Sequence, residues 1–225
     1  MHDIEAVVFD LDETLVTAPD YGPERLAAAF DRAGVEPFFT IEDFARWMPK
    51  VEGENPLDLR LRCFRGIAEE TGHPVDDADA VARAFEMPAP REFEPVSGAT
   101  ALVRTLRDRG YDLALVTNGP EAKQRAKLEL LDLDGTFDAA VFGDTGCGVK
   151  PEPGPLEHAL AALGAPARSA VNIGDRVEVD LEPAAALGMA TVWIPPGGVP
   201  EEHPPAADHV VGDLETLHTE PWAGA

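Results

Sequence analysis

Residues 6–15 read AVVFDLDETL, and the prediction of the fold starts from this stretch. Its first four residues, Ala6–Phe9, are all apolar and show no alternation of polar and apolar side chains. Continuous apolar runs of this length are typical of strands that are buried on both faces of a parallel sheet. Two acidic residues, Asp10 and Asp12, follow directly. The stretch therefore predicts a buried strand that ends in a pair of carboxylates.

Further short apolar runs along the chain have the same character and are bounded by turn residues. They are Leu113–Val116, Ala139–Phe142, Ala170–Ile173 and Ala190–Ile194, with a weaker strand at His209–Val211. Helical patterns separate them, at Gly98–Arg109, Glu121–Leu131, Pro155–Leu163 and Asp180–Leu187. Strands that alternate with helices predict an α/β fold with a doubly wound, Rossmann-like parallel sheet.

One long segment after the first strand interrupts this alternation, because it carries helical patterns and no strand signal. The helical patterns are Pro23–Ala33, Ile41–Met48, Pro56–Thr71 and Asp76–Phe85. Three prolines, Pro88, Pro90 and Pro95, mark the end of the segment. We therefore expect a helical cap domain at residues 17–91, inserted into a core that consists of residues 1–16 and 92–225.

Polar residues follow each of the first four predicted strands of the core. Asp10 and Asp12 follow the first, Thr117 and Asn118 the second, Lys150 the third, and Asp175 and Asp180 the fourth. Ligands of open α/β sheets bind outside the carboxyl ends of the strands, so these side chains are candidates for one site. Neighbouring carboxylates repel each other unless a cation lies between them or one is protonated. A cluster of carboxylate oxygens with room for water suits Mg²⁺.

The remaining polar residues suit the binding of a phosphoryl group. The Lys150 ammonium and the Thr117 hydroxyl are matching donors for phosphate oxygens. A carboxylate nucleophile forms an acyl phosphate and so divides one difficult displacement into two easier steps. Asp12 could protonate the leaving oxygen and then deprotonate the attacking water, which is typically worth about 10²–10⁴-fold in rate.

Four motifs in this order resemble those of the haloacid dehalogenase-like (HAD) hydrolases. The motifs are FDLDETL (9–15), LALVTNG (113–119), Lys150-Pro151 and IGDRVEVDLEPAAALGM (173–189). The resemblance covers nearly the whole chain. The inserted helices resemble the C1-type cap of this family, a lid that closes over the site and excludes water.

The resemblance implies a role for each residue of the motifs. It implies that Asp10 is the nucleophile, that Asp12 is the general acid and base, and that Mg²⁺ is bound by Asp10, the backbone carbonyl of Asp12, and Asp175. It also implies that the phosphoryl group is held by Thr117 and Lys150, with Asn118 beside them. Asp180 would support the metal or Lys150. As alternatives, Thr117 and Asn118 could cap the helix near Glu121, and Asp180 could be a helix N-cap.

Three further residues bear on substrate choice. Glu13 stands where many sugar-phosphate members of the family carry glycine, and Arg176 stands where a small hydroxyl residue is common. Arg176 is a surface charge or a substrate contact. Lys50 lies in a cap turn that dips toward the active site in C1-capped relatives, so it is either a contact for a second anionic group of the substrate or a solvated loop lysine. A cap lysine of phosphonate-cleaving relatives forms a Schiff base.

The chain has 225 residues and a net charge of −24, with 42 acidic against 18 basic side chains. This charge argues against nucleic acid or an anionic membrane as a partner. Cys63 and Cys147 are far apart and predict neither a disulfide framework nor a zinc site. The first residues lack the pattern of a signal peptide, and no apolar run is long enough to span a membrane. We expect a soluble cytoplasmic protein, a monomer or a homodimer.

These observations predict an enzyme that hydrolyses a small-molecule phosphate ester with Mg²⁺. The nearest alternative is a phosphomutase of the same family acting on a phosphosugar, and a phosphonatase is a weaker one. A non-catalytic binding protein is least favoured, because every expected catalytic side chain is present. A cap that shuts favours a small substrate over a phosphorylated macromolecule.

The acidic, lysine-poor composition predicts an adaptation to high salt. Only four of the basic residues are lysines, and dense screening by salt removes the repulsion between the many carboxylates. We expect the melting temperature to be higher in molar KCl than in dilute buffer, measured by differential scanning fluorimetry. A melting temperature that does not rise with salt would contradict the adaptation.

Overall fold

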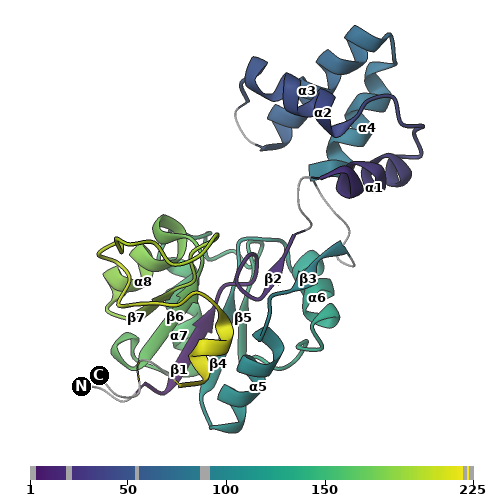
Figure 1. The fold of residues 1–225 in the computed structure, drawn as a ribbon. Helices are drawn as coiled ribbons and strands as arrows, with labels where there is room; N and C mark the ends of the chain where they lie inside the picture. The colour runs from purple at the N-terminus through teal and green to yellow at the C-terminus, as the bar shows by residue number, and fades with distance from the viewer. Residues whose placement is uncertain (1–3, 19–21, 54–55, 87–91, 220–221, 223–225) are drawn as a thin grey trace. The chain divides into compact units, whose positions relative to one another are not determined.

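The computed structural model describes residues 4–18, 22–53, 56–86, 92–219 and 222 (Figure 1). The chain forms two compact units. One comprises Met1–Thr17 and Phe93–Ala225, and the other comprises Ala18–Glu92. The boundaries thus fall one residue further along the chain than those expected for the core and the cap. Among the described residues, no helix combines the length and the apolar character needed to cross a bilayer.

The larger unit is built on a six-stranded parallel sheet with the strand order β5-β4-β1-β6-β7-β8. The strands are β1 (Ala6–Phe9), β4 (Asp112–Val116), β5 (Ala139–Val141), β6 (Ala170–Gly174), β7 (Ala190–Trp193) and β8 (His209–Val210). Each differs from the prediction by no more than a single terminal residue. The predicted α/β fold with a Rossmann-like parallel sheet is confirmed.

The register of the central strands brings their carboxyl ends to the same level. Phe9 of β1 pairs with Leu115 of β4 on one side and with Ile173 of β6 on the other. All four residues of β1 are fully buried, which explains why the run Ala6–Phe9 is apolar throughout. The residues that follow β1, β4 and β6 therefore emerge at one edge of the sheet.

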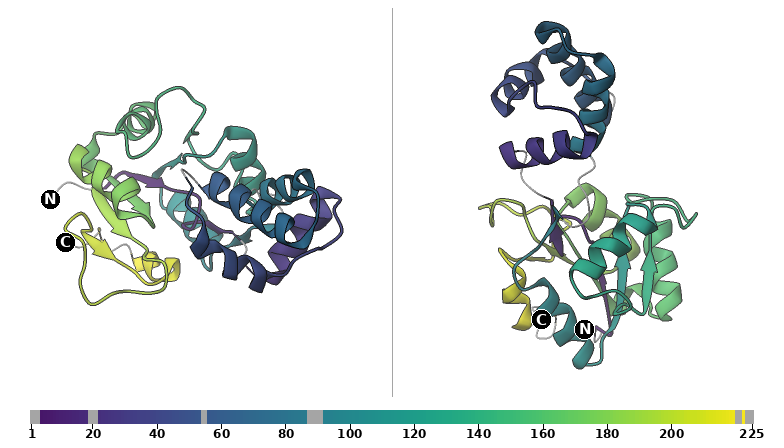
Figure 2. Two further views of the ribbon diagram at one scale, coloured as in Figure 1. Left: turned by 90° about the horizontal axis from the view of Figure 1, so that it is seen from above. Right: turned by 90° about the vertical axis from the view of Figure 1, so that its right-hand side faces the viewer.

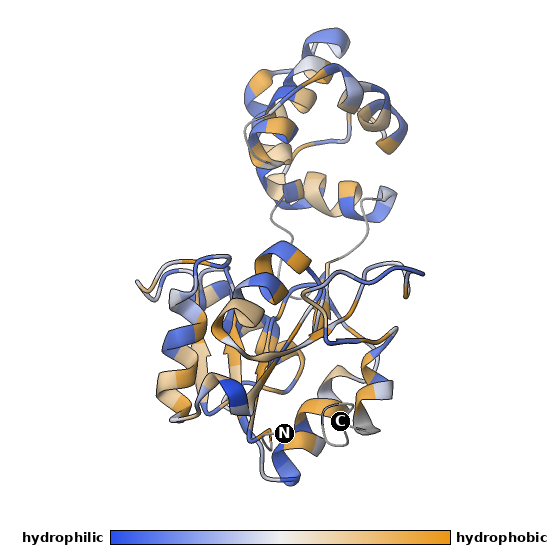
Figure 3. Cartoon of the chain, turned by 90° about the vertical axis from the view of Figure 1, so that its left-hand side faces the viewer, coloured by the Kyte–Doolittle hydropathy of each residue, from blue (hydrophilic) through white to orange (hydrophobic). Residues whose placement is uncertain are grey.

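Helices cover both faces of this sheet (Figure 2). They are α5 (Ala99–Asp108), α6 (Glu121–Leu130), α7 (Gly154–Leu163) and α8 (Glu182–Leu187), with 3₁₀ turns at Ala167–Ser169 and Leu214–Thr219. One core cluster joins Ala6 and Val8 of β1 to Leu156 and Ala159 of α7. Val7 and Phe9 point to the opposite face, because successive side chains of a strand alternate. Figure 3 shows the apolar residues concentrated on the strands and on the inner faces of the helices.

Two features of this unit differ from the prediction. A short antiparallel ribbon of β2 (Val16–Thr17) and β3 (Glu94–Pro95) forms in the segment that was expected to lack strands. Strands of two residues are too short to show a period, so the sequence pattern does not reveal them. The predicted helix Asp180–Leu187 is in fact a π-helical turn, Val177–Leu181, followed by the shorter helix α8.

The smaller unit is entirely helical and has its own core. It contains α1 (Pro23–Ala33), α2 (Ile41–Trp47), a 3₁₀ turn at Met48–Lys50, α3 (Pro56–Thr71) and α4 (Val75–Glu86). The helix α2 begins with a capping box, in which the Thr40 hydroxyl accepts from the Asp43 backbone and the Asp43 carboxylate accepts from the Thr40 backbone. Edge-to-face contacts between phenylalanines fill the core, with members Phe30, Phe39, Phe44, Phe64 and Phe85.

Candidate active site

The Asp10 carboxylate lies at the end of β1, next to a buried lysine. Lys150 Nζ donates to Asp10 Oδ1 at 2.7 Å and to Asp180 Oδ1 at 2.6 Å. All three side chains are almost completely buried, and the Asp10 residue is only 3% exposed. One ammonium therefore bridges the two carboxylates that follow β1 and β6, as expected if these strands deliver residues to one site.

Two oxygens in this cluster are left without a partner. Asp10 Oδ2 and Asp175 Oδ1 are buried and accept no hydrogen bond from the described residues. A buried acceptor without a partner typically costs about 1–3 kcal/mol. One carboxylate oxygen from each of Asp10, Asp175 and Asp180 lies within 4.8 Å of the others. This oxygen-rich set, with two oxygens unsatisfied, fits a hard divalent cation such as Mg²⁺.

The protonation equilibria of these carboxyl groups reflect the same crowding. Burial raises the pKa of Asp10 to about 6, although the nearby Lys150 opposes the shift. Burial, followed by repulsion from Asp10 and Asp180, raises the pKa of Asp175 to about 7. Burial also disfavours the charged form of Lys150, yet Asp10 and Asp180 together raise the pKa of its ammonium above the usual value. Burial is thus the main cause of the raised pKa values of both carboxyl groups, and repulsion between the carboxylates adds to it.

Asn118 fixes the backbone of Lys150. Its Nδ2 donates to the Lys150 carbonyl at 2.7 Å, and its Oδ1 accepts from the Lys150 amide at 2.8 Å. Both ends of the Asn118 amide are therefore used to hold the backbone of Lys150. Neither Thr117 nor Asn118 caps α6, whose N-cap is Pro120.

The loop after β6 positions Asp175 and Asp180. Asp180 Oδ2 accepts from the Arg176 amide at 3.0 Å, and the Asp180 carbonyl accepts from Asn172 Nδ2 at 3.0 Å. A Cβ on Gly174 would lie 2.5 Å from the Asp180 Cβ, so only glycine leaves room for this carboxylate. Asp180 lies inside the π-helical turn, and the N-cap of α8 is Leu181 and not Asp180.

The side chain of Asp12 has different partners from that of Asp10. Asp12 Oδ2 accepts from Gln124 Nε2 at 2.7 Å, and Oδ1 is paired with Lys127 Nζ. The side chain is 41% exposed. The Thr117 hydroxyl joins this group, because its Oγ1 accepts from Gln124 Nε2 at 2.6 Å.

Gln124, Lys127 and Trp193 also lie in the site, although the sequence pattern did not predict them. Gln124 and Lys127 are nearly fully buried on α6, and Trp193 Nε1 donates to the Asp175 carbonyl at 2.8 Å. Gln124 and Lys127 occupy positions of the inward helix face that an apolar residue would normally fill. That polar interruption is a signal in the sequence, but its meaning depends on which loop the helix faces.

The remaining candidates lie as follows. Arg176 is exposed beside Asp175, and its charge partly opposes the rise in the pKa of that carboxyl group. Lys50 lies in the helical unit, exposed, with its Nζ 4.6 Å from the centroid of the Trp47 ring. Cys63 is buried, Cys147 is partly buried, and both are free thiols.

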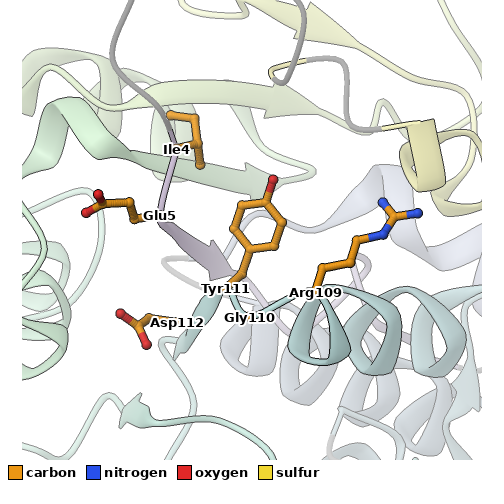
Figure 4. A pocket seen from close by; sticks show the side chains of 6 residues that line it. All are labelled: Ile4, Glu5, Arg109, Gly110, Tyr111 and Asp112. Carbon is orange, nitrogen blue, oxygen red and sulfur yellow. The ribbon is translucent and has the colours of Figure 1, made fainter.

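A separate pocket opens at the opposite end of the sheet. Its volume is about 530 Å³, and it is lined by Ile4, Glu5, Arg109, Gly110, Tyr111 and Asp112 (Figure 4). The pairing of Ala6 with Asp112 places it at the amino ends of β1 and β4. It therefore does not belong to the cluster around Asp10.

Comparison with known proteins identifies the family. The haloacid dehalogenase-like hydrolase family matches residues 4–188. Phosphoserine phosphatase from Thermus thermophilus is 35% identical over 160 residues, which cover 71% of this chain and 64% of that protein. Phosphoglycolate phosphatase from Rhodospirillum rubrum is 33% identical over 194 residues, which cover 84% of this chain and 78% of that protein.

A solved structure agrees with these relatives. The crystal structure of a HAD phosphatase from Thermococcus onnurineus superposes with a TM-score of 0.63 and 26% identity, and the match covers 96% of this chain and 97% of that one. The chain belongs to the haloacid dehalogenase-like hydrolase family. The resemblance seen in the four motifs is thereby confirmed at the level of the family.

The raised pKa values predict how a divalent metal stabilises the protein at different pH. Asp10 and Asp175 bind protons more tightly in the folded state than in the unfolded state, so their contribution to stability is complete below about pH 4 and is lost as the pH rises through about 6 to 7. A bound cation replaces those protons. We expect Mg²⁺ to raise the melting temperature by several degrees more at about pH 8 than at about pH 5.

The measurement compares EDTA-treated and Mg²⁺-loaded protein by differential scanning calorimetry at both pH values. Asp175→Asn removes one of the two carboxyl groups and should therefore reduce the difference between the metal-induced shifts at the two pH values. A metal-induced shift that is equal at both pH values, or larger in acid, would contradict this explanation.

Proposed function

We propose that this protein is a Mg²⁺-dependent phosphatase that hydrolyses a small-molecule phosphomonoester through an aspartyl phosphate on Asp10. The observation that carries the proposal is the environment of the Asp10 carboxylate. One oxygen is held by Lys150, the other is buried and has no hydrogen-bond partner among the described residues, and the carboxylate lies in a cluster with Asp175 and Asp180. A carboxylate with one oxygen held in place and the lone pairs of the other not used in a hydrogen bond is suited to act as a nucleophile. The relatives named as phosphatases support the same reaction.

The reaction proceeds in two displacements. In the first, an Asp10 oxygen forms a bond to phosphorus, the ester P–O bond breaks, and the departing alkoxide oxygen takes a proton from Asp12. In the second, water attacks the phosphorus of the acyl phosphate, Asp12 takes a proton from that water, and the bond between Asp10 and phosphorus breaks. The products are the alcohol and inorganic phosphate, and both carboxyl groups return to their starting states.

The neighbouring residues supply binding and orientation. Lys150 Nζ and the Thr117 hydroxyl donate to the phosphoryl oxygens, while Asn118 positions Lys150 through its two backbone contacts. Asp180 orients the Lys150 ammonium from the opposite side. Mg²⁺ would be held by Asp10, Asp175 and the Asp12 backbone carbonyl, and its charge offsets the repulsion between an anionic nucleophile and an anionic phosphate.

The substrate is best described as a small phosphorylated metabolite. Phosphoserine and phosphoglycolate, named for two of the relatives, belong to this class. The net charge of −24 disfavours phosphorylated nucleic acid. The helical unit Ala18–Glu92 is proposed as the C1-type cap, and Lys50 stays a predicted contact for a second anionic group of the substrate. Cytoplasmic location, salt adaptation and a monomeric or homodimeric state also stay predictions.

The nucleophile assignment predicts the behaviour of Asp10→Asn. We expect Mg²⁺-dependent hydrolysis of p-nitrophenyl phosphate to fall by about 10³-fold or more, because the neutral amide oxygen is a poor nucleophile. The exposed carboxylate Asp108, at the end of α5, provides the control Asp108→Asn, which should retain full activity. Activity is followed as released inorganic phosphate. With a phosphosugar as the substrate, a phosphorylated isomer in place of inorganic phosphate would show a mutase. Hydrolysis of p-nitrophenyl phosphate that survives in Asp10→Asn would exclude Asp10 as the nucleophile.

A further inference from the structure

The inward face of α6 presents two polar side chains to Asp12. Gln124 and Lys127 lie three residues apart, so they share one face of the helix. Gln124 is 1% exposed and Lys127 is 3% exposed. Lys127 pairs with Asp12 Oδ1, and Gln124 donates to Asp12 Oδ2 at 2.7 Å. Both oxygens of the carboxyl group are therefore held by one helix.

The burial of Lys127 indicates that the function of its ammonium is to pair with the Asp12 carboxylate. Its Nζ lies 4.1 Å from the centroid of the Phe93 ring, so the ammonium is placed over an aromatic face. An apolar residue would fill this space without the cost of desolvating an ammonium. The next residue, Leu128, is buried and already packs in the core. The position therefore does not need a lysine for packing.

Gln124 links Asp12 to Thr117. An amide nitrogen has two hydrogens, and Gln124 Nε2 directs them to Asp12 Oδ2 and to Thr117 Oγ1, the latter at 2.6 Å. Because the Thr117 hydroxyl accepts this bond, its own hydrogen remains available for a phosphoryl oxygen. A Cβ on Gly119 would lie 2.6 Å from Gln124 Nε2, so the glycine makes room for the amide.

We propose that Gln124 and Lys127 are positioning residues for acid–base catalysis, which fix the orientation of the Asp12 carboxyl group and tie it to the phosphoryl-binding hydroxyl of Thr117. This inference rests on the proposed role of Asp12 as general acid and base. Each carboxyl oxygen has two acceptor sites, so Asp12 can exchange a proton with a ligand while it keeps both contacts with α6. The helix thereby sets the geometry of proton transfer through its contacts with Asp12. Lys127 itself does not contact the substrate.

The test uses the dependence of rate on the leaving group. An alkoxide needs a proton to depart, whereas p-nitrophenolate is a stable anion that departs without one. The two substrates are p-nitrophenyl phosphate and an alkyl phosphate that the wild type hydrolyses, chosen from phosphoglycolate, phosphoserine and glycerol 3-phosphate. In Lys127→Met and Gln124→Leu, we expect kcat/KM for the alkyl phosphate to fall about 10- to 100-fold more than kcat/KM for p-nitrophenyl phosphate.

Three further variants complete the series. Lys127→Arg keeps the cation and should recover most of the alkyl phosphate activity. Arg125→Met removes the same charge from the exposed face of α6, where Arg125 pairs with Glu121 and Asp134, and should leave the ratio between the two substrates unchanged. Folding of each variant is checked by circular dichroism. Gly119→Ala displaces the Gln124 amide without removing a charge, and it takes the place of a variant that proves to be unfolded.

The outcomes distinguish the positioning role of α6 from the acid–base role of Asp12. If Asp12→Asn selectively loses the alkyl phosphate but Lys127→Met and Gln124→Leu lose both substrates equally, or lose neither, the positioning role is overturned. If Asp12→Asn itself shows no selectivity between the substrates, the proposed acid–base role of Asp12 fails, and the role of α6 fails with it.

Discussion

The repulsion among buried carboxylates is the constraint on which the site depends. Asp10, Asp175 and Asp180 are all buried at one edge of the sheet, and the single ammonium of Lys150 lies between two of them. Burial is the main cause of the raised pKa values of Asp10 and Asp175, and repulsion from neighbouring carboxylates adds to it. Relief of this repulsion would favour the binding of a divalent cation by the three carboxylates.

The fold holds this unfavourable arrangement in place through the backbone. The parallel register aligns the ends of β1, β4 and β6, so the three loops start from fixed points. Asn118 then anchors both backbone groups of Lys150, and Gly174 leaves the space that the Asp180 side chain occupies. The backbone of Lys150 and the side chain of Asp180 are therefore positioned in part by uncharged neighbours.

Two carboxylates of one short loop have been given different environments. Asp10 is buried beside Lys150, whereas Asp12 is 41% exposed at its side chain and is held by α6. Carboxyl groups whose surroundings differ in this way are suited to different tasks, which supports the proposed division between a nucleophile and a proton carrier. The separation arises because successive polar residues of the loop meet different secondary structure elements.

The sequence by itself determined the fold class and most of the candidate residues. Buried parallel strands must be apolar throughout, and the residues after them must be polar to reach a ligand, so Asp10, Thr117, Lys150 and Asp175 can be read from local pattern. The tertiary structure decided the rest. Gln124 and Lys127 are two polar residues within a helix until the helix is placed against Asp12, and the ribbon of β2 and β3 exists only because distant dipeptides pair. Local composition reports burial and strand ends, whereas contacts between distant segments depend on how the elements pack.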